Sequence, residues 1–265
     1  MLDVPVAEVG TDLILSVLQP IWLEMPETAR RVRGRIEKVL AAAKARGLRD
    51  RDAANPAAWR GHLDVLLPKQ PRKGLRHHAA LAYKDAPAFM AALRSRPALA
   101  ARCLEFTVLT AARSGEALGS TWGEIDLEAQ TWSVPASRMK AGMDHVVVLS
   151  LPAVDLLQAL RPKEPRNDER VFSVNGVARS NMAMAMLLRR MDHGDITVHG
   201  FRSTFKDWAL NETEFPDELS EEALAHTIGS NVRRAYRRGA ALERRRGLMN
   251  AWADYVSGEG YSLDT

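Results

Sequence analysis

The last quarter of the chain carries two histidines, an arginine and a tyrosine in a fixed order. They are His199, Arg202, His226 and Tyr236, and a second arginine, Arg113, lies upstream. Guanidinium groups bind phosphate bidentately, imidazoles transfer protons, and a phenol can act as a nucleophile. Together these groups could clamp a phosphodiester and attack it without a metal ion. The pattern therefore predicts chemistry in which DNA is cut through a covalent bond to the protein.

Arg113 has a structural interpretation as well as a chemical one. It follows an apolar helix and precedes Ser114-Gly115-Glu116, a pattern typical of a helix that begins again. A guanidinium buried at such a junction is costly unless it is paired. Glu116, three residues later, could be its partner. Two roles for Arg113 are therefore equally consistent with the sequence: phosphate binding and a purely structural ion pair.

The histidine and the tyrosine are similarly ambiguous when each is taken alone. His199 by itself would more often be a core histidine, but Arg202 follows it by three residues, so both should project from one helical face. Tyr236 lies in the arginine-rich run 231–238, where cations would favour the phenolate of a group whose usual pKa is about 10. An ordinary amphipathic tyrosine is the alternative.

Composition is consistent with nucleic-acid binding but does not require it. The 265-residue chain has 29 arginines and eight lysines, with a formal net charge of +4. The planar fork of arginine suits phosphate, yet a GC-rich genome would enrich arginine equally well. The length predicts two domains with real cores.

Several classes of protein are disfavoured by what the sequence lacks. Cys103 is the only cysteine, which excludes a disulfide framework and indicates a reducing compartment, and its apolar neighbours predict a buried, inert thiol. No run approaches the roughly 18 apolar residues of a membrane span, so we expect a cytoplasmic protein. His77 and His78 would diverge on a helix, and no metal-ligand spacing occurs, so no metal is expected. No phosphate-binding Gly-Lys-Ser/Thr loop occurs, and no cofactor is expected.

Hydrophobic periodicity predicts a mainly α-helical protein with a small antiparallel β-sheet, an α+β fold. Helices are expected at 11–25, 27–47, 85–94, 97–112, 152–161, 180–191, 200–210, 218–226, 230–237 and 241–256. Strands are expected at Glu124–Leu127, Thr131–Val134 and His145–Leu149. The proline-rich, basic segment 68–76 is typical of a linker, so we predict domains at residues 1–70 and 71–265.

Two basic features in the first half could follow a phosphate backbone. In the expected helix at 27–47, Thr28 is the predicted N-cap and Gly47 ends the helix. One face carries the apolar stripe of Val32, Ile36, Val39 and Leu40, and the other face is rich in arginine and points to solvent or to a DNA groove. The candidate DNA-binding residues of this face and of the linker are Arg31, Arg33, Arg35, Lys69 and Lys73.

An ordered series of motifs extends over nearly the whole chain. The segments are Arg31–Glu37, Asn55–Leu63, Leu109–Leu118, Trp122–Leu127, Arg138–Leu149, His199–Ala209, Ala223–Gly229, Arg233–Arg246 and Leu248–Tyr255. This series resembles the tyrosine recombinase (phage integrase) family, and within it the bacterial P4-type prophage and genomic-island integrases. The resemblance implies a tyrosine recombinase catalytic fold in the second domain, preceded by a partial helical core-binding domain that contacts DNA.

The resemblance implies that four residues bind and order the scissile phosphate. Arg113 and Arg202 resemble the two arginines that contact it. His226 resembles the histidine that donates a hydrogen bond to a non-bridging oxygen, and Glu116 resembles the acidic residue that helps to order the site.

Three further residues would exchange the bonds. Tyr236 resembles the nucleophile that forms a 3′-phosphotyrosyl bond, Lys140 resembles the lysine that protonates the leaving 5′-oxygen, and His199 resembles the histidine that assists as an acid–base group. The covalent bond retains the energy of the broken one, so rejoining needs no nucleotide. The implied activity is site-specific recombination that integrates a prophage or a genomic island.

The implied partners are double-stranded DNA at attachment sites, three further copies of the chain in a homotetramer at synapsis, a DNA-bending host factor and an excisionase. The chain is short for this family, so we expect a fragment, a truncated gene or a 5′-eroded island integrase. Two alternatives remain open. One is a remnant that binds DNA without recombining it, and the other is a type IB topoisomerase-like enzyme that only relaxes supercoils.

Overall fold

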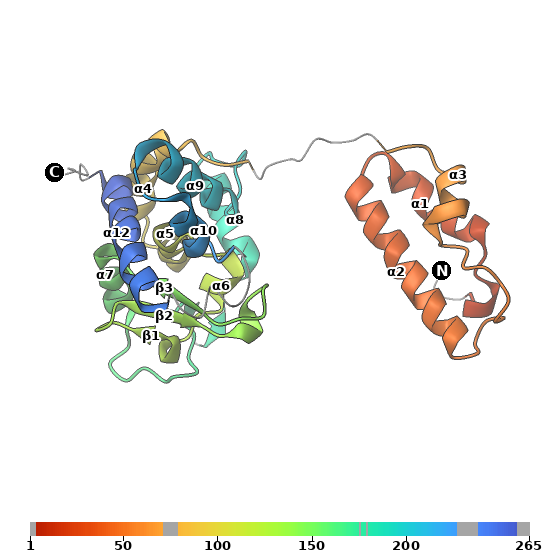
Figure 1. Ribbon diagram of the computed structural model, residues 1–265, viewed down its shortest axis with the longest axis horizontal. Helices are drawn as coiled ribbons and strands as arrows, with labels where there is room; N and C mark the ends of the chain where they lie inside the picture. The colour runs from red at the N-terminus through yellow and green to blue at the C-terminus, as the bar shows by residue number, and fades with distance from the viewer. Residues whose placement is uncertain (1–3, 71–78, 175, 179, 227–237, 259–265) are drawn as a thin grey trace. The chain divides into compact units, whose positions relative to one another are not determined.

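The computed structural model describes residues 4–70, 79–174, 176–178, 180–226 and 238–258. The chain divides into two compact units, residues 1–75 and 76–265, and each has its own hydrophobic core (Figure 1). The expected helix at 230–237 lies outside the described residues, and so do Lys73, His77, His78 and Tyr236.

The first unit is a small helical body. Its elements are η1 (Val6–Glu8), α1 (Thr11–Trp22), α2 (Pro26–Ala45), the π-turn η2 (Trp59–Leu63) and α3 (Asp64–Leu66). Ile14, Leu18 and Trp22 are four residues apart on α1, so they share one face, and all three are buried. They pack with Leu40 of α2 and with Leu63 to form the core of the unit.

Helix α2 differs from its prediction at its start and in the width of its apolar stripe, but it ends where expected. The helix begins at Pro26, so the predicted N-cap at Thr28 is wrong; the fixed φ of proline suits the first helical position. Gly47, with φ of +72°, follows the end of the helix as expected. Leu40 is buried, but Val39 is 61% exposed, so the stripe is narrower than predicted.

The second unit is mainly helical, as the sequence predicts. Its helices are α4 (Ala86–Arg94), α5 (Leu99–Thr110), α6 (Ser114–Leu118), α7 (Leu151–Leu160), α8 (Asn181–Arg190), α9 (Gly200–Glu212), α10 (Asp217–Ala223) and α12 (Arg238–Ser257), with short 3-10 turns η3 (Tyr83–Asp85), η4 (Trp122–Glu124) and η5 (Ala136–Arg138). α5 is the central helix, because nine of its 12 residues are buried and it contacts α4, α6, α7, α8, α9 and α12. Its carboxyl end leads directly to Arg113.

The buried thiol of Cys103 lies on α5. Burial raises the pKa of this thiol to about 12, so the nucleophilic thiolate is strongly disfavoured. The prediction that Cys103 is buried is confirmed.

A three-stranded antiparallel sheet lies against the helices, in the order β1-β2-β3. Its strands are β1 (Ile125–Asp126), β2 (Thr131–Val134) and β3 (His145–Val148). Trp132 pairs with Val147, and Trp132 and Val134 are buried while Ser133 between them is exposed. This alternation gives the sheet one face in the core and confirms the predicted α+β fold. A second hairpin, β4 (Ser173–Val174) with β5 (Val177–Ala178), was not predicted from the sequence.

The carboxyl-terminal helix α12 is fastened to the centre of the unit by aromatic contacts. The indole nitrogen of Trp252 donates to the carbonyl oxygen of Val108 on α5 at 2.8 Å. Its ring lies 5.0 Å from that of Trp208 on α9 and stacks on Tyr255 at 6.1 Å. Figure 1 shows that α12 runs past β3, which it also contacts. This packing fixes the helices that surround the end of α5.

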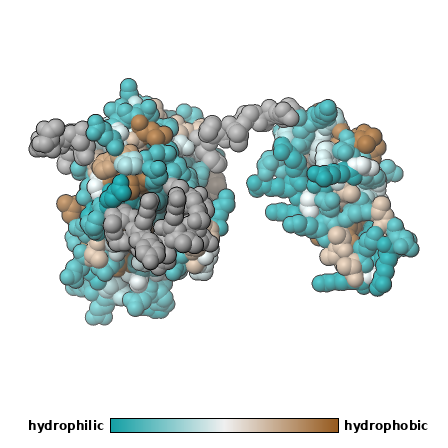
Figure 2. Space-filling view, in the orientation of Figure 1, coloured by the Kyte–Doolittle hydropathy of each residue, from teal (hydrophilic) through white to brown (hydrophobic). Residues whose placement is uncertain are grey.

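Hydrophilic residues cover most of the visible face of each unit (Figure 2). In the first unit a hydrophobic patch lies over α3, where Val65 and Leu66 are exposed (Figure 2). Among the described helices, none has the length and apolar character needed to cross a membrane.

Candidate active site

Arg113 occupies the junction between α5 and α6. α5 ends at Thr110, its C-cap Ala111 has a left-handed φ of 49°, and Arg113 is the N-cap of α6. The buried carboxylate of Glu116 accepts hydrogen bonds from the Arg113 backbone nitrogen at 3.0 Å and from its guanidinium at 2.8 Å. The ion pair suggested by the spacing is therefore present. The Arg113 side chain still exposes 23% of its surface, so it is partly accessible from solvent.

Arg202 caps two helices at once. It is buried in the first turn of α9 and donates to the carbonyl oxygens of Ala111 at 2.6 Å and Leu224 at 2.5 Å. These carbonyls belong to the C-caps of α5 and α10. Because the carboxyl end of a helix carries partial negative charge, both bonds offset the cost of burying the guanidinium. The same contacts bring Arg202 close to the segment that carries Arg113.

Two positive charges are held near each other at this point. Burial and, to a smaller extent, the charge of Arg113 together lower the pKa of Arg202 to about 10, while Glu116 and Glu221 oppose the shift. A pKa of about 10 leaves Arg202 charged at neutral pH. Like charges held together in a partly buried place favour binding of an anion.

His226 joins Arg202 through its ring. Its Nε2 lies 3.1 Å from Nη2 of Arg202, and its Nδ1 lies 2.7 Å from a carboxylate oxygen of Glu221. A guanidinium can only donate, so Nε2 must accept, and Nδ1 must carry the ring proton and donate a hydrogen bond to the Glu221 carboxylate. The ring is therefore held in one tautomer between a carboxylate and the buried arginine.

Glu221 is in turn held by Lys206, whose ammonium lies 2.5 Å from it and also pairs with Asp217. Burial raises the pKa of the Glu221 carboxyl, but hydrogen bonds from Lys206 and His226 lower it by more, so its pKa lies below the ordinary value. The carboxylate is thus charged at neutral pH. Sequence reasoning did not select Glu221, because the contact depends on a chain reversal at Ala225, which has a left-handed φ of 51°.

For the other predicted site residues that it describes, the structure gives the element on which each lies and its exposure. His199 is the N-cap of α9 and is exposed, whereas Arg202 is buried. Lys140 is exposed on the connection between β2 and β3. Tyr236 lies outside the described residues, so its position relative to Arg113 stays a prediction.

The candidate DNA-binding arginines of the first unit differ from one another. Arg31 and Arg35 are exposed on α2, and Arg31 pairs with Glu27 one turn earlier. Arg33 instead turns inward: it pairs with Glu37, donates to the carbonyl oxygen of Ala57 at 2.8 Å and lies 5.8 Å from the ring centroid of Trp59. Arg33 thus links α2 to the segment 55–59. Lys69 is exposed after α3.

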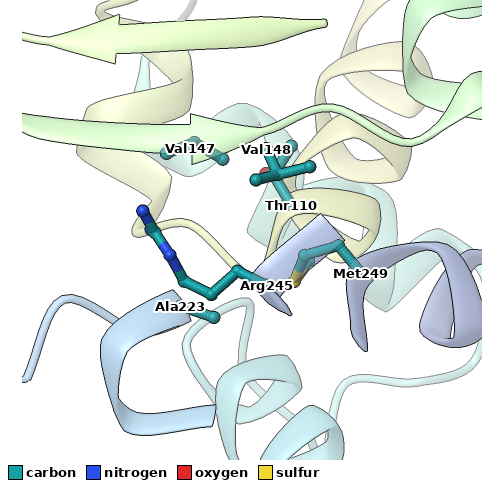
Figure 3. A pocket seen from close by; sticks show the side chains of 6 residues that line it. All are labelled: Thr110, Val147, Val148, Ala223, Arg245 and Met249. Carbon is teal, nitrogen blue, oxygen red and sulfur yellow. The ribbon is translucent and has the colours of Figure 1, made fainter. Parts of the chain in front are cut away.

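Sequence reasoning also missed two partly buried groups, one on β3 and one on α12. His145 on β3 has its pKa lowered to about 4, first by burial and then by the charge of Arg245. Arg245 on α12 donates to the carbonyl oxygen of Val146 at 2.8 Å. Figure 3 shows its side chain extending toward β3, in a small pocket lined by Thr110, Val147, Val148, Ala223, Arg245 and Met249. No local pattern reveals this pair, because about 100 residues separate its members.

Gly200, between His199 and Arg202, lets a neighbouring segment pass close to α9. A Cβ at this position would collide with the carbonyl oxygen of Ala79 and would lie 2.9 Å from the Cα of Ala80. Both are backbone atoms, which cannot rotate away. The Thr204 hydroxyl also donates to the carbonyl oxygen of Leu81 at 2.7 Å, so this segment is fixed in place.

We therefore expect Gly200→Ala to lower the free energy of unfolding by about 1–3 kcal/mol, because overpacking forces the backbone to shift. Urea denaturation of the intact chain would measure the change. The matched control is Gly247→Ala on α12, where a Cβ would meet only the Phe215 ring at 3.5 Å. The control should be neutral or stabilising by about 0.5–1 kcal/mol. Equal effects of the two substitutions would contradict this interpretation.

Comparison with known families assigns both units. The profile of the phage integrase family matches residues 79–243, and that of the phage integrase central domain matches residues 1–62. This chain belongs to the phage integrase family. The resemblance to tyrosine recombinases that the motifs indicate is therefore confirmed.

Curated prophage integrases are similar to most of the chain. Prophage integrase IntA of Escherichia coli (strain K12) is 33% identical over 261 residues, which is 96% of this chain and 60% of the relative. Prophage integrase IntZ of the same organism is 34% identical over 95% of this chain and 62% of its own length. The integrase of Enterobacteria phage P4 is 32% identical over 68% of this chain and 46% of the relative. This chain thus spans about three fifths of the length of the first two relatives.

Solved integrase structures share the fold. A lambda integrase tetramer bound to a Holliday junction gives a TM-score of 0.60 at 16% identity, covering 85% of this chain and 66% of the other. A lambda integrase dimer bound to a COC′ core site gives 0.58 at 17% identity, covering 85% and 82%. At these identities the likeness establishes only the fold of this phage integrase family member.

Proposed function

We propose that this phage integrase family member is a site-specific recombinase that cuts and rejoins DNA through a 3′-phosphotyrosyl intermediate when a prophage or genomic island integrates. The observation that carries the proposal is the convergence of Arg113, Arg202 and His226. Two guanidiniums that repel each other, with an imidazole in contact with one of them, form a site suited to one phosphodiester. The relatives' description as prophage integrases supports the same activity.

In the proposed reaction, Tyr236 supplies the oxygen that attacks phosphorus. The bond between phosphorus and the 5′-oxygen breaks, Lys140 gives a proton to that oxygen, and a free 5′-hydroxyl leaves. The phenol proton passes to His199 or to water. Rejoining reverses these transfers with the 5′-hydroxyl of another strand, so the number of phosphate ester bonds does not change. Neither a nucleotide nor a metal ion takes part in these steps.

The phosphate-binding residues act mainly through charge. Removing one such electrostatic donor from an active site typically costs roughly 10²–10³ in rate. His226 has a further requirement, because its Nε2 accepts a hydrogen bond from Arg202 in this structure. To donate to a phosphate oxygen, the ring must gain a second proton, and the adjacent Glu221 carboxylate balances the resulting charge.

The proposed DNA contacts extend to the first unit. Arg31, Arg35 and Lys69 are exposed and would contact phosphates, which positions the protein without reading sequence. We further propose that four copies assemble on two DNA duplexes, as the lambda integrase tetramer on a Holliday junction suggests. A DNA-bending host factor and an excisionase would then control direction.

Trapping of a covalent complex tests the proposal. A DNA site is first selected from a random-sequence duplex library by binding to the intact chain. A set of duplexes is then nicked at successive positions across that site, so that a short fragment diffuses away after cleavage and the complex cannot reverse. We expect a denaturation-resistant protein–DNA complex with one nick position, formed in the presence of a metal chelator.

The other outcomes separate the alternatives. Salt-dependent binding without any covalent complex would identify a DNA-binding remnant and overturn the proposed activity. Relaxation of supercoiled plasmid without exchange between two selected sites would identify a topoisomerase-like enzyme. Strand exchange between two sites would support the recombinase assignment.

A further inference from the structure

The connection that carries Lys140 is closed at its base. Residues 136–144 leave β2 and return to β3, and the backbone nitrogen of Ala136 donates to the Asp144 carboxylate at 2.7 Å. Within this closed loop Lys140 and the three residues after it are exposed, whereas Met139 is 7% exposed. Lys140 therefore follows directly after a buried anchor.

Arg138 joins the loop by a hydrogen bond to α6, the helix that begins next to Arg113. Its Nη1 donates to the carbonyl oxygen of Glu116 on α6 at 3.0 Å, and its Nη2 pairs with the Glu124 carboxylate. Glu124 is itself held by the indole of Trp132 at 3.0 Å. The guanidinium thus bridges α6, η4 and the loop, and its side chain is only 24% exposed.

The residues around the Arg138 guanidinium leave room for it and provide its hydrogen-bond acceptors. A Cβ at Gly119 would collide with Nη1 of Arg138, so the guanidinium lies directly against the end of α6 and would have to move if this glycine were replaced. Two acceptors that lie on separate elements require the planar fork of arginine, which lysine cannot reproduce. Glu116 uses its carboxylate for Arg113 and its carbonyl oxygen for Arg138. One residue therefore connects the phosphate-binding arginine to the loop of the proposed general acid.

We propose that Arg138 is a positioning residue that holds Lys140 at the leaving oxygen by fixing the β2–β3 connection to Glu116 and Glu124. The inference rests on the proposed role of Lys140 as general acid. Its physical basis is the sensitivity of proton transfer to geometry, since a misplacement of about 1 Å can cost roughly 10² in rate. A loop already fixed before DNA binds avoids that loss.

Replacing the bridging 5′-oxygen of the substrate with sulfur distinguishes a misplaced general acid from general disruption of the active site. In the ordinary substrate the bond between phosphorus and the 5′-oxygen breaks and the oxygen needs a proton. When sulfur replaces that bridging oxygen, the bond between phosphorus and sulfur breaks and a thiolate leaves without a proton. A thiol has a pKa of about 8.5, far below that of an alcohol, so the general acid becomes dispensable. A defect confined to the acid should therefore disappear with sulfur.

The experiment measures single-turnover formation of the covalent complex by the intact chain on the selected nicked duplex, with oxygen or sulfur at the scissile position. The variants are Arg138→Met, Lys140→Ala, both together, and Arg166→Met as the control. Arg166 pairs with Asp168 at 2.8 Å on an exposed loop. Arg166→Met therefore removes a paired guanidinium, as Arg138→Met does, but away from the site.

We expect Arg138→Met and Lys140→Ala each to slow the oxygen substrate by roughly 10²-fold, within the range for general acid catalysis. On the sulfur substrate, the rate of each variant should lie within about threefold of the rate of the unchanged chain. The double variant should be no slower than Lys140→Ala alone, because both changes remove the same function. Arg166→Met should match the unchanged chain on both substrates.

Three results would overturn the inference. If Arg138→Met is equally slow on both substrates while Lys140→Ala recovers with sulfur, Arg138 maintains the fold, and only this inference fails. A double variant far slower than Lys140→Ala would lead to the same conclusion. If Lys140→Ala itself does not recover with sulfur, the proposed role of Lys140 fails together with the positioning role built on it.

Discussion

A Tyr236→Phe variant should form no covalent complex with the selected nicked duplex, although it should still bind that duplex with unchanged salt dependence. Phenylalanine keeps the aromatic ring but lacks the oxygen that must attack phosphorus, so no slower covalent route remains. The electrostatic contacts that hold DNA do not involve the phenol. Gel separation under denaturing conditions measures the complex, and a binding titration at several salt concentrations measures the affinity.

The matched controls are Tyr83→Phe and Tyr255→Phe. A hydrogen bond with Glu212 raises the pKa of Tyr83, and burial raises the pKa of Tyr255, so each phenolate is disfavoured. The two rings also pack together, with centroids 6.5 Å apart. Both variants should retain the covalent complex. A complex formed by Tyr236→Phe would mean that another group is the nucleophile.

The second large effect is expected from Arg202→Lys, which should slow cleavage by roughly 10²–10³-fold. Lysine retains the charge, but its compact ammonium cannot reach Ala111, Leu224 and His226 together as the guanidinium does. At least one helix-end carbonyl would be left unpaired, at a cost of about 1–3 kcal/mol in the free energy of unfolding. Single-turnover cleavage and urea denaturation measure the two effects separately.

The control for this change is Arg190→Lys, at the exposed carboxyl end of α8. It should leave both the cleavage rate and the unfolding transition unchanged. Cleavage by Arg202→Lys at the rate of the unchanged chain would show that a guanidinium at this position is not needed for cleavage. Loss of stability without loss of rate would restrict Arg202 to a structural role.

Much of the fold follows from local patterns. β2 has the predicted bounds because Trp132 and Val134 alternate with polar residues over a buried face. The long helices were predicted from periodicity within a few residues of their ends. The start of α2 was wrong because proline at Pro26 determines the first turn, two residues before the polar cap expected at Thr28. The hairpin of β4 and β5 was missed because two-residue strands give no periodic signal.

The site was predictable only in part. The pairing of Arg113 with Glu116 is local, three residues apart at a helix start, so the spacing indicates it. The contact between Arg202 and His226 joins residues 24 apart and was anticipated only through the resemblance to tyrosine recombinases. Glu221 reaches His226 because the backbone reverses at a left-handed alanine, a conformation that the residue type does not suggest.

Longer-range contacts escaped prediction because no pattern within one element encodes them. Arg138 was noted only as the start of the motif segment Arg138–Leu149, yet it reaches a carbonyl oxygen 22 residues earlier in the chain. Arg33 was grouped with the exposed arginines of α2, but a carbonyl oxygen and a tryptophan ring from a later segment turn it inward. In both cases tertiary packing decides where a guanidinium lies.

The central claim is that a single phosphate is held by both arginines while Tyr236 bonds to it. The most direct test is the structure of the covalent complex trapped on the nicked duplex. We expect the phosphorus to be esterified to the Tyr236 oxygen, with guanidinium nitrogens of Arg113 and Arg202 and Nε2 of His226 about 3 Å from its free oxygens. A phosphate bonded to another residue, or arginines that contact different phosphates, would contradict the account.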